Sequence, residues 1–364
     1  MRILFVLEHF HPYLGGAEHL FWTLARALVQ EGCKVAVVTT RFRKGLSKEE
    51  TLEGIKIYRV DCYNRYFFSF FSLPVILRLT PDYDIIHTTS YNAALPAWIA
   101  ARIKKKPAII TFHEVWGRLW WKLPYASFLE RLAFYSWEQL LLRLPFKRFI
   151  GVSEFTRQAL IEAGVSPQKA IRIYNGMEYS DFEGFEHQPP KNFTFTYFGR
   201  LGISKGLDLL LPAAAQHLTQ HPNHQFKMII PTYPKGMFDK IKKTIQTHGL
   251  EEQIRLLHHL PRKQLFNEIC QSSCIVVPSY SEGFCFVAAE GVALEVPIIS
   301  SQKGALAEVV AGRHIAMNGQ SIENLATALN KAASAQWKYK MVQKFLLSDA
   351  VNEYITLYKD LTSK

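Results

Sequence analysis

The sequence predicts an α/β protein with two Rossmann-like, doubly wound domains. Three observations lead to this prediction. The chain of 364 residues is long enough for two domains of ordinary size. Short apolar segments alternate with amphipathic helical segments along its whole length, as in parallel α/β sheets. A glycine-containing loop also follows the first strand of each half, where such folds bind anionic ligands.

The first half contains six predicted strands with helices between them. The strands are residues 3–7, 35–39, 55–60, 84–87, 108–111 and 149–152, and the helices are 18–30, 94–102 and 154–163. A second cycle begins near residue 193. Its strands are 195–198, 227–230, 254–257, 274–277 and 297–300, and its helices include 207–218 and 239–248. The glycine- and proline-containing segment 179–191 reads as the linker. We therefore expect domains at residues 1–180 and 181–342, with an amphipathic C-terminal helix in 343–364 packing back on the first.

Composition narrows the class of protein. The net charge is +12, and residues 1–180 carry most of it, with 24 Lys or Arg against 15 Asp or Glu. A basic face favours an anionic partner, although a solubilising surface explains the charge too. The five scattered cysteines show no zinc-binding spacing and read as reduced thiols, which favours a cytoplasmic protein. The apolar N-terminus is too short for a signal peptide, and no uncharged run approaches a membrane span.

Three loops carry the residue types of an anion-binding site. Gly15 and Gly16 lie between the first strand and the first helix. Gly199 to Gly206 follow the first strand of the second half and include Arg200 and Lys205, a pair of cations suited to a leaving diphosphate. A tight turn explains the first loop equally well, and a solvated pair of cations would explain the second.

The segment from Ser281 to Glu290 is the most specific. It follows a strand, and Gly283, Phe284 and Cys285 form a predicted turn that would expose backbone amides at a helix N-terminus. Glu282 and Glu290 are eight residues apart, so on one helix both would face the same ligand. An N-cap glutamate followed by an ordinary surface glutamate is the alternative reading.

These motifs, in this order, resemble glycosyltransferase family 4, whose members have the GT-B fold and retain the anomeric configuration of the sugar. The resemblance covers nearly the whole chain. It includes Gly15-Gly16-Ala-Glu, Asp84-Ile-Ile-His, Gly199-Arg-Leu with Lys205-Gly, and Glu282-x7-Glu290. It implies that residues 1–180 form the acceptor-binding domain and residues 181–342 the domain that binds the nucleotide-sugar donor. The two domains would face each other across the cleft that holds the donor, and no metal or other cofactor would be needed.

The resemblance also implies residue roles. Gly15 and Gly16 would offer amides to the donor diphosphate, and Arg200 and Lys205 would clamp it. Glu282 would contact the donor sugar. A second set completes the site: Glu290 would bind the ribose, Gly283, Phe284 and Cys285 would line the donor site, and His113 would lie near the transferred sugar.

The chain departs from the family pattern at several positions. His258 stands where the family has a glycine, and Glu295 replaces a helix-ending glycine. These departures lie in the donor half, so they leave the preferred base and sugar open. Asp82-Tyr-Asp84 resembles a metal-binding Asp-x-Asp motif, but the matching family aspartate is structural.

Two aromatic segments indicate a membrane-facing surface on the first domain. Residues 63–79 and 116–149 combine many aromatic side chains with Arg and Lys, as helices lying in a bilayer surface do. Burial of these aromatics in the core is the competing reading. Stacking on single-stranded nucleic acid is a further alternative, but no nucleic-acid motif accompanies these segments.

The sequence thus predicts a retaining glycosyltransferase that moves a hexose-type sugar from a uridine or guanosine diphosphate donor. The acceptor would be a glycan or a lipid-linked glycan of polysaccharide or glycolipid synthesis, and the protein would be cytoplasmic and peripheral on an anionic membrane. One rival is a non-catalytic nucleotide-sugar or glycan-binding protein of the same fold. A dinucleotide-dependent oxidoreductase is another, disfavoured because no Gly-x-Gly-x-x-Gly follows the first strand.

Overall fold

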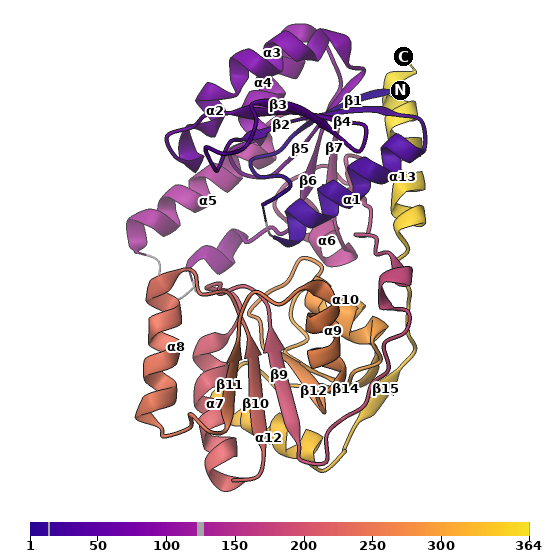
Figure 1. Ribbon diagram of the computed structural model, residues 1–364. Helices are drawn as coiled ribbons and strands as arrows, with labels where there is room; N and C mark the ends of the chain where they lie inside the picture. The colour runs from indigo at the N-terminus through magenta and orange to yellow at the C-terminus, as the bar shows by residue number, and fades with distance from the viewer. Residues whose placement is uncertain (14, 122–126, 364) are drawn as a thin grey trace. The chain divides into compact units, whose positions relative to one another are not determined.

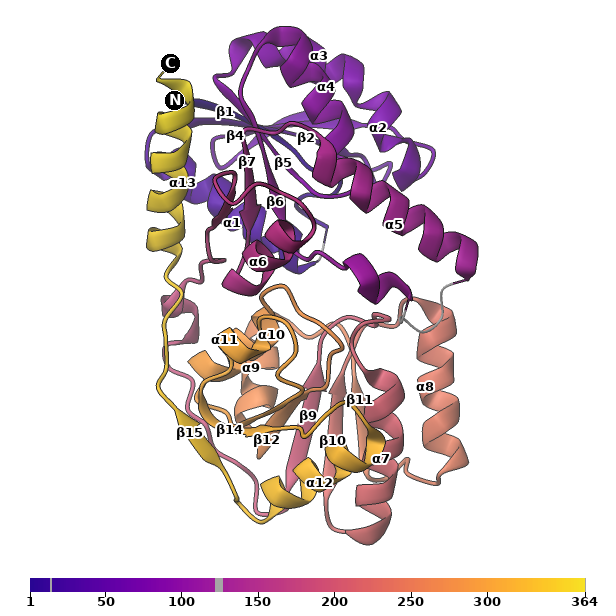
Figure 2. The ribbon, with the colours of Figure 1, turned by 180° about the vertical axis from the view of Figure 1, so that it is seen from behind.

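The computed structural model describes residues 1–13, 15–121 and 127–363, and the chain divides into two compact units (Figure 1). Unit 1 comprises the described residues up to Met177 and those from Phe345 onward, and unit 2 comprises Glu178–Lys344. Both ends of the chain therefore belong to unit 1, as Figure 2 also shows.

Unit 1 is built on an eight-stranded sheet in the order β3-β4-β2-β1-β5-β6-β7-β8. All neighbouring strands are parallel except β3 and β4. Its strands are β1 (Arg2–Val6), β2 (Lys34–Thr40), β3 (Glu49–Leu52), β4 (Ile55–Val60), β5 (Ile85–Thr89), β6 (Ala108–Phe112), β7 (Arg148–Gly151) and β8 (Ala170–Arg172). Its α-helices are α1 (Gly16–Gln30), α2 (Phe68–Phe71), α3 (Leu73–Leu79), α4 (Ala94–Lys104), α5 (Phe128–Arg143), α6 (Glu154–Glu162) and α13 (Leu347–Thr362), and its 3-10 helices are η1 (Arg65–Phe67), η2 (Thr80–Asp82) and η3 (Gly117–Trp121).

Helices cover both faces of this sheet because successive strand residues point to opposite sides. Leu4 and Val6 pack with the side chains of α2, α3 and α4. On the other face Phe5 makes an edge contact with Phe21 of α1. Here α13 is held by His87 in the middle of β5, whose ring contacts the Tyr358 hydroxyl at 2.6 Å. The C-terminal helix thus completes the core of unit 1.

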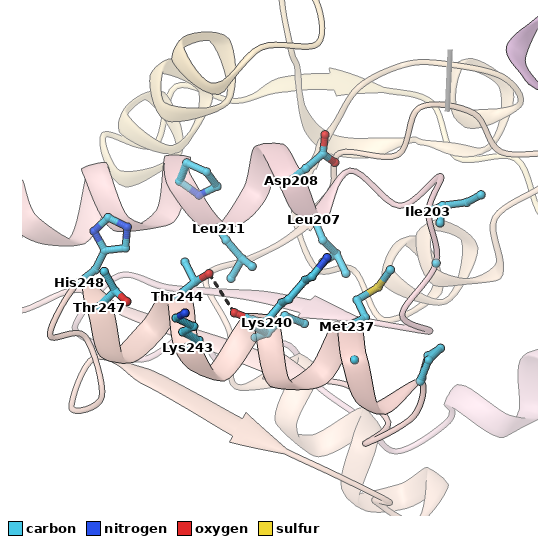
Figure 3. A pocket seen from close by; sticks show the side chains of 15 residues that line it. Ile203, Leu207, Asp208, Leu211, Met237, Lys240, Lys243, Thr244, Thr247 and His248 are labelled. Carbon is cyan, nitrogen blue, oxygen red and sulfur yellow. Dashed lines mark hydrogen bonds between the residues drawn. The ribbon is translucent and has the colours of Figure 1, made fainter. Parts of the chain in front are cut away.

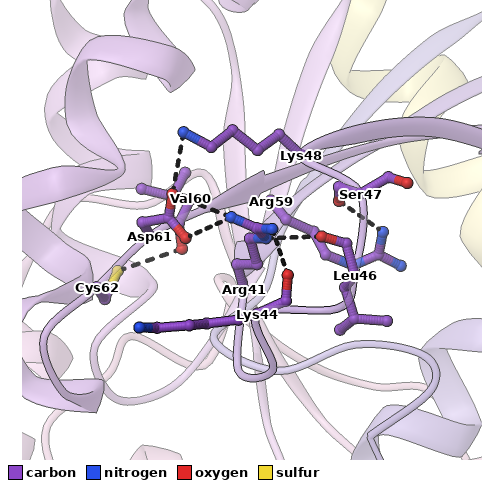
Figure 4. Close-up of polar contacts among 9 residues, drawn as sticks. All are labelled: Arg41, Lys44, Leu46, Ser47, Lys48, Arg59, Val60, Asp61 and Cys62. Carbon is purple, nitrogen blue, oxygen red and sulfur yellow. Dashed lines mark hydrogen bonds and ion pairs between the residues drawn. The ribbon is translucent and has the colours of Figure 1, made fainter.

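A polar network fixes the loop between β2 and β3 (Figure 4). Arg41 donates from Nε to the Leu46 carbonyl at 2.6 Å and pairs with Asp61 at 3.2 Å. Lys48 pairs with the same carboxylate at 3.1 Å. The two cations lower the pKa of Asp61, chiefly through the Lys48 hydrogen bond. Arg41 and Lys48 are thus paired within the protein, so this part of the basic charge of unit 1 does not require an anionic ligand to explain it.

Unit 2 has a seven-stranded sheet in the order β11-β10-β9-β12-β13-β14-β15, parallel except for β15. Its strands are β9 (Thr194–Phe198), β10 (Gln225–Ile229), β11 (Ile254–Leu257), β12 (Cys274–Val277), β13 (Ile298–Ser300), β14 (Gly312–Ala316) and β15 (Lys338–Lys340). Its helices are η4 (Tyr179–Phe182), α7 (Leu207–Gln220), α8 (Lys235–Thr247), α9 (Arg262–Cys270), α10 (Phe286–Ala293), α11 (Leu306–Val309) and α12 (Ile322–Ala333).

Each sheet has one point at which the strand order reverses. In unit 1 the chain runs outward from β1 through β2 on one side and from β5 through β6 on the other. In unit 2 the corresponding pair is β9 and β12. Loops leaving the carboxyl ends of such a pair diverge and leave a crevice, which is where doubly wound folds bind ligands.

All five cysteines are free thiols. Among the helices formed by the described residues, none is long and apolar enough to cross a bilayer.

Candidate active site

The two loops at the reversal point of unit 2 carry most of the predicted site residues. The loop after β9 contains Arg200 and Lys205, and the loop after β12 contains Glu282 and Cys285. The topology therefore brings together four residues that are up to 85 positions apart in the sequence.

Glycines shape the loop that carries the two cations. Gly206 has a φ of +68°, and a Cβ there would overlap the Pro278 carbonyl of the neighbouring loop. Only glycine permits both the conformation and the close approach. The two loops are joined further by the Tyr280 amide, which donates to the Ser204 carbonyl at 2.7 Å. Arg200 is exposed at the start of the loop, and its carbonyl accepts the Tyr197 hydroxyl at 3.0 Å.

Lys205 and Glu282 form the central charge pair of the site. The Lys205 ammonium lies 2.7 and 3.0 Å from the two carboxylate oxygens, and the Ser279 hydroxyl donates to Glu282 Oε1 at 2.6 Å. Burial alone would lower the pKa of Lys205, but the Glu282 charge outweighs it and raises this pKa above its ordinary value. Lys205 is therefore a fixed cation that retains a third N–H for another ligand.

The turn before α10 places Cys285 in a left-handed conformation, with φ +75°. Its carbonyl accepts the amides of Ala288 and Ala289 at 3.1 Å each, which makes it the N-cap of α10. Burial, and then the Glu282 charge, raises the pKa of its thiol well above the ordinary value, so it stays protonated beside the ion pair. Gly304 packs against Glu282 so closely that a Cβ there would overlap its backbone.

The helical-spacing argument for Glu282 and Glu290 is wrong, because α10 begins only at Phe286. Glu282 precedes the helix and pairs with Lys205, whereas Glu290 lies within α10 and faces Arg262 at 3.6 Å. Burial raises the pKa of Glu290 to about 7, against the opposing effect of Arg262. Arg262 also contacts Asp181 at 3.2 Å.

Gly283 and Phe284 complete the turn between the two glutamates. Phe284 is buried and makes an edge contact with Phe286 at a ring-centroid distance of 5.2 Å. The turn is therefore anchored in the core, and its left-handed residue is Cys285 and not the glycine.

The remaining predicted residues, Gly15, Gly16 and His113, belong to unit 1. Gly15 is the N-cap of α1, and a Cβ on it would overlap the Glu18 carboxylate, which lies over the first turn of the helix. His113 follows β6, and its ring lies 5.9 Å from that of Phe21. Each set of residues lies at the carboxyl ends of strands in its own unit.

The two departures from the family pattern, His258 and Glu295, affect only the backbone around them. The left-handed residue after β11 is His259, with φ +52°, whereas His258 binds the Ile230 carbonyl at 2.7 Å through Nδ1. Glu295 adopts φ +57° after α10, so it takes the conformation of the glycine that it replaces. In the part of the chain that the structure describes, the hydrogen bonds and ion pairs of Lys205 and Glu282 involve neither residue.

The Asp-x-Asp segment is part of the framework of unit 1. Asp84 accepts hydrogen bonds from the Arg2 backbone amide at 2.8 Å and from its guanidinium at 2.7 Å. These bonds lower the pKa of Asp84. In the described parts of the chain, no group of three or more His, Cys, Asp or Glu is arranged to hold a metal ion.

A separate groove of about 670 Å³ lies between α7 and α8 (Figure 3). Its floor is apolar, with Leu207, Leu211 and Met237, and Lys240 and Lys243 line its α8 side. None of the predicted site residues lines it. Asp208, at its edge, accepts the Tyr280 hydroxyl at 2.5 Å, which ties the start of α7 to the loop after β12.

Sequence reasoning missed four residues that organise this site. Ser279 orients Glu282, Arg262 faces Glu290, the Tyr197 hydroxyl supports the Arg200 loop and Gly304 admits the Glu282 backbone. Only Gly304 had a recognisable signal, because the resemblance to family 4 implies a pair of glycines before Glu308, where this chain has Lys303-Gly304-Ala305.

Comparisons with known proteins identify the family of the chain. The profile described as Glycosyltransferase Family 4 matches residues 14–180, and that described as Glycosyl transferases group 1 matches residues 181–345. A human phosphatidylinositol N-acetylglucosaminyltransferase subunit is 24% identical over 344 residues, covering 91% of this chain and 68% of that protein. The GDP-mannose:cellobiosyl-diphosphopolyprenol alpha-mannosyltransferase of Xanthomonas oryzae is 26% identical, covering 82% and 78%.

Solved structures share the fold over the whole chain. Sucrose-phosphate synthase from Thermosynechococcus elongatus superposes with a TM-score of 0.82 at 19% identity, covering 100% of this chain and 99% of that one. Anabaena HepE, in complex with UDP and glucose, gives 0.74 at 17% identity, covering 99% and 100%. With both profiles matching in order across most of its length and with the GT-B fold, the chain belongs to the family 4 glycosyltransferases.

Proposed function

We propose that this glycosyltransferase moves a hexose-type sugar from a uridine or guanosine diphosphate donor to a hydroxyl of a glycan or a lipid-linked acceptor. The observation that carries the proposal is the Lys205–Glu282 pair at the reversal point of unit 2, with Arg200 in the same loop. Cations fixed at this point suit a leaving diphosphate, because negative charge develops there in the transition state.

The donor classes come from the relatives. HepE is in complex with UDP and glucose, and the Xanthomonas relative is named for GDP-mannose. Two relatives are named for phosphatidylinositol and for a diphosphopolyprenol-linked disaccharide, which favours a lipid-linked acceptor here and a place in surface polysaccharide or glycolipid synthesis.

The reaction that we propose retains the anomeric configuration. The bond from the anomeric carbon to the phosphate oxygen breaks, and the bond to the acceptor oxygen forms on the same face of the sugar. The leaving phosphate takes the acceptor proton, so no separate protein base is required. Arg200 and the third N–H of Lys205 stabilise the phosphate charge. Glu282 contacts the sugar, and no metal takes part. The roles implied by the resemblance for His113, Gly15 and Gly16 of unit 1 stay predictions.

The remaining donor contacts involve α10 and the turn before it. Gly283, Phe284 and Cys285 shape this turn, and Glu290 accepts the ribose hydroxyls. The competing contact of Glu290 is Arg262 at 3.6 Å, longer than a hydrogen bond, so the carboxylate retains acceptor capacity.

A thermal-shift panel of nucleoside diphosphates and nucleotide sugars tests the donor site. A ligand that binds only the folded protein raises the midpoint, and we expect uridine or guanosine diphosphate to do so. Arg200→Ala and Glu290→Ala should abolish the rise, whereas Lys331→Ala, an exposed residue of α12, should keep it. No rise with any nucleotide, or a rise unchanged in both site variants, would refute the proposed donor site.

We further propose that unit 1 contacts an anionic membrane through an aromatic cluster formed by Tyr63, Tyr66, Phe67, Phe70 and Phe71. Tyr63 is 91% exposed and Phe70 is 74% exposed, and ring contacts at 5.4 to 6.5 Å link four of the five. No acidic side chain occurs between residues 62 and 81, although Arg65 and Arg78 do. Exposed aromatics beside cations are typical of surfaces that lie at a bilayer interface.

Vesicle co-sedimentation tests this contact. We expect binding to phosphatidylcholine vesicles that contain phosphatidylglycerol, and little to phosphatidylcholine alone. Phe70→Glu with Tyr63→Glu should release the protein, whereas Tyr339→Glu, an equally exposed aromatic of unit 2, should not. Binding that persists in the double variant would refute the contact. We propose that this membrane surface is on the cytoplasmic side, a location that the five free thiols favour.

A further inference from the structure

The groove between α7 and α8 is not explained by the proposed donor site. It has a volume of about 670 Å³ and follows the length of α8, with the first half of α7 as its other wall (Figure 3). Gly202 and Ile203, from the loop after β9, line one end of it. Among its described lining residues, none is an ionisable residue of the donor site. A ligand of this groove would therefore be distinct from the donor.

The groove forms because the side chains between the two helices are too short to fill it. Leu210 of α7 and Ile241 of α8 belong to the core of unit 2. Along α8 the residues that line the groove recur every three or four positions and include Met237, Thr244 and Thr247. Threonine side chains are short, so they leave space beside α7. With 13 residues at about 1.5 Å each, α8 gives the groove a wall of about 20 Å.

The floor of the groove is apolar and lies below a cationic edge. Leu207 and Ile241 are buried and Met237 is half-buried, whereas Lys240 and Lys243 are exposed. A flat bilayer would reach the exposed edge and not this floor, whereas a row of projecting side chains reaches it. Helices present such rows, and the ridge of one helix packs into the groove between others. The shape therefore favours a helix as the occupant.

The charge of the groove favours an acidic occupant. Helix α8 contains four lysines and one aspartate, and two of these lysines line the groove. Asp208 is the only acidic side chain among the described lining residues, and its carboxylate already accepts the Tyr280 hydroxyl at 2.5 Å. An acidic segment is attracted to this edge, whereas a second copy of the same groove would bring lysines against lysines.

We propose that the groove is the docking site for an acidic amphipathic helix of a partner protein. The apolar side chains of that helix contact Leu207, Leu211 and Met237, and its carboxylates pair with Lys240 and Lys243. The apolar contacts supply most of the affinity, and the exposed charge pairs set the orientation and the association rate. The proposal is independent of the donor chemistry, because the donor-site side chains do not line the groove.

Selection from a displayed library of helical peptides, each about four turns long, tests the groove with the full chain as the target. We expect the enriched peptides to be acidic and to carry apolar residues at the i, i+3, i+4 and i+7 positions. Lys240→Glu with Lys243→Glu should weaken their binding about tenfold or more, because both edge pairs become repulsive. Lys331→Glu with Lys338→Glu makes the same charge change at two exposed lysines elsewhere in unit 2 and should bind as the wild type does.

Leu211→Glu provides a second readout, because it places a charge in the apolar floor and should abolish binding. Its thermal midpoint without peptide shows whether this variant is folded. The exposed lysine variant decides the test if it is not. Enrichment of basic peptides, equal binding by the wild type and the Lys240–Lys243 variant, or no enrichment at all would overturn the proposal. Binding of oleate that this variant loses, with no peptide enriched, would overturn it in favour of a lipid.

Discussion

The two reversal points of this enzyme have the same topology and different chemistry. In unit 2 the loops after β9 and β12 bring a cation and a carboxylate into direct contact, with Lys205 2.7 Å from Glu282 and the exposed Arg200 nearby. In unit 1 the carboxylate of Glu8, after β1, lies 2.7 Å from Arg65 and accepts a hydrogen bond from Asn92, after β5, at 2.9 Å. The difference shows how one topology carries different chemistry, because the strand order determines where the loops meet and the loops determine the charge at that point.

The largest expected effect concerns the charge pair of unit 2. Lys205→Met should lower kcat by about 10²–10³-fold, as the loss of one transition-state donor does. It should also lower the free energy of unfolding by about 3–5 kcal/mol, because Glu282 is left buried without its counterion. Chemical denaturation and donor turnover measure the two effects separately.

The double variant Lys205→Met with Glu282→Gln distinguishes chemistry from stability. Removing both charges should restore most of the stability and none of the turnover, because the buried charge is gone and so is the clamp. Recovery of turnover in the double variant would show that Lys205 serves only to neutralise Glu282. The comparison between the two units would then lose its chemical basis.

A smaller effect is expected from the titration of Glu290, which should change the kcat/KM for the donor by up to about tenfold per pH unit. Its folded-state pKa of about 7 means that the carboxylate, which we propose to accept the ribose hydroxyls, is lost as the pH falls below 7. The kcat/KM for the donor should therefore decrease below pH 7 in the wild type. In Glu290→Gln it should be low throughout and independent of pH in this range. A wild-type profile that is flat from pH 6 to 8 would contradict this role.

The same group has a predictable effect on stability. The folded pKa of Glu290 is raised above its ordinary value of 4.5, so its stabilising contribution is present below 4.5 and is lost as the pH rises through about 7. His87 acts in the opposite sense, because burial lowers its pKa to about 3. Its contribution is present above 6.5 and is lost as the pH falls toward 3.

Removing one hydroxyl tests how α13 is held in unit 1. Tyr358→Phe should cost about 1–3 kcal/mol, because it leaves the buried His87 Nδ1 without the contact that it makes at 2.6 Å. Tyr354→Phe is the matched control. Its hydroxyl lies 3.4 Å from Thr111 Oγ1, so it should cost less. A larger loss for Tyr354→Phe, measured by urea denaturation, would show that the histidine does not anchor the helix.

The sequence predicted the parts of this fold that depend on periodicity and composition. The buried parallel strands are continuous apolar runs, so β1 and β12 were found within one residue of their observed bounds. The edge strands β3, β8 and β15, and β14 beside β15, were missed because they are short or because their half-exposed or exposed residues lack such a run. Such a strand forms because it pairs with a neighbouring strand, and the residues of the strand alone do not show which segment that neighbour is.

The candidate site was predictable where a residue type has a chemical signature, as in the cations of the β9 loop. The residues that position these site residues could not be predicted from the sequence. Ser279 and Arg262 are ordinary in sequence, and their roles arise only because β12 and α9 place them beside the two glutamates. Glu8, too, carries no motif, and its contacts with Arg65 and Asn92 join three distant segments. Contacts between residues far apart in the sequence depend on the order of the strands in the sheet, which the sequence analysis did not predict.

The smallest expected effect concerns Glu295, one of the unit 2 residues that depart from the family pattern. It is exposed and holds φ +57° at the end of α10, so Glu295→Gly should raise stability by about 0.5–1 kcal/mol. Ser334→Gly, at the C-cap of α12 with an ordinary φ of −92°, should bring no gain. Donor turnover should be unchanged in Glu295→Gly, because this side chain makes no contact with the charge pair. A change in turnover would add Glu295 to the chemistry of unit 2 and extend the contrast between the two reversal points to the far end of α10.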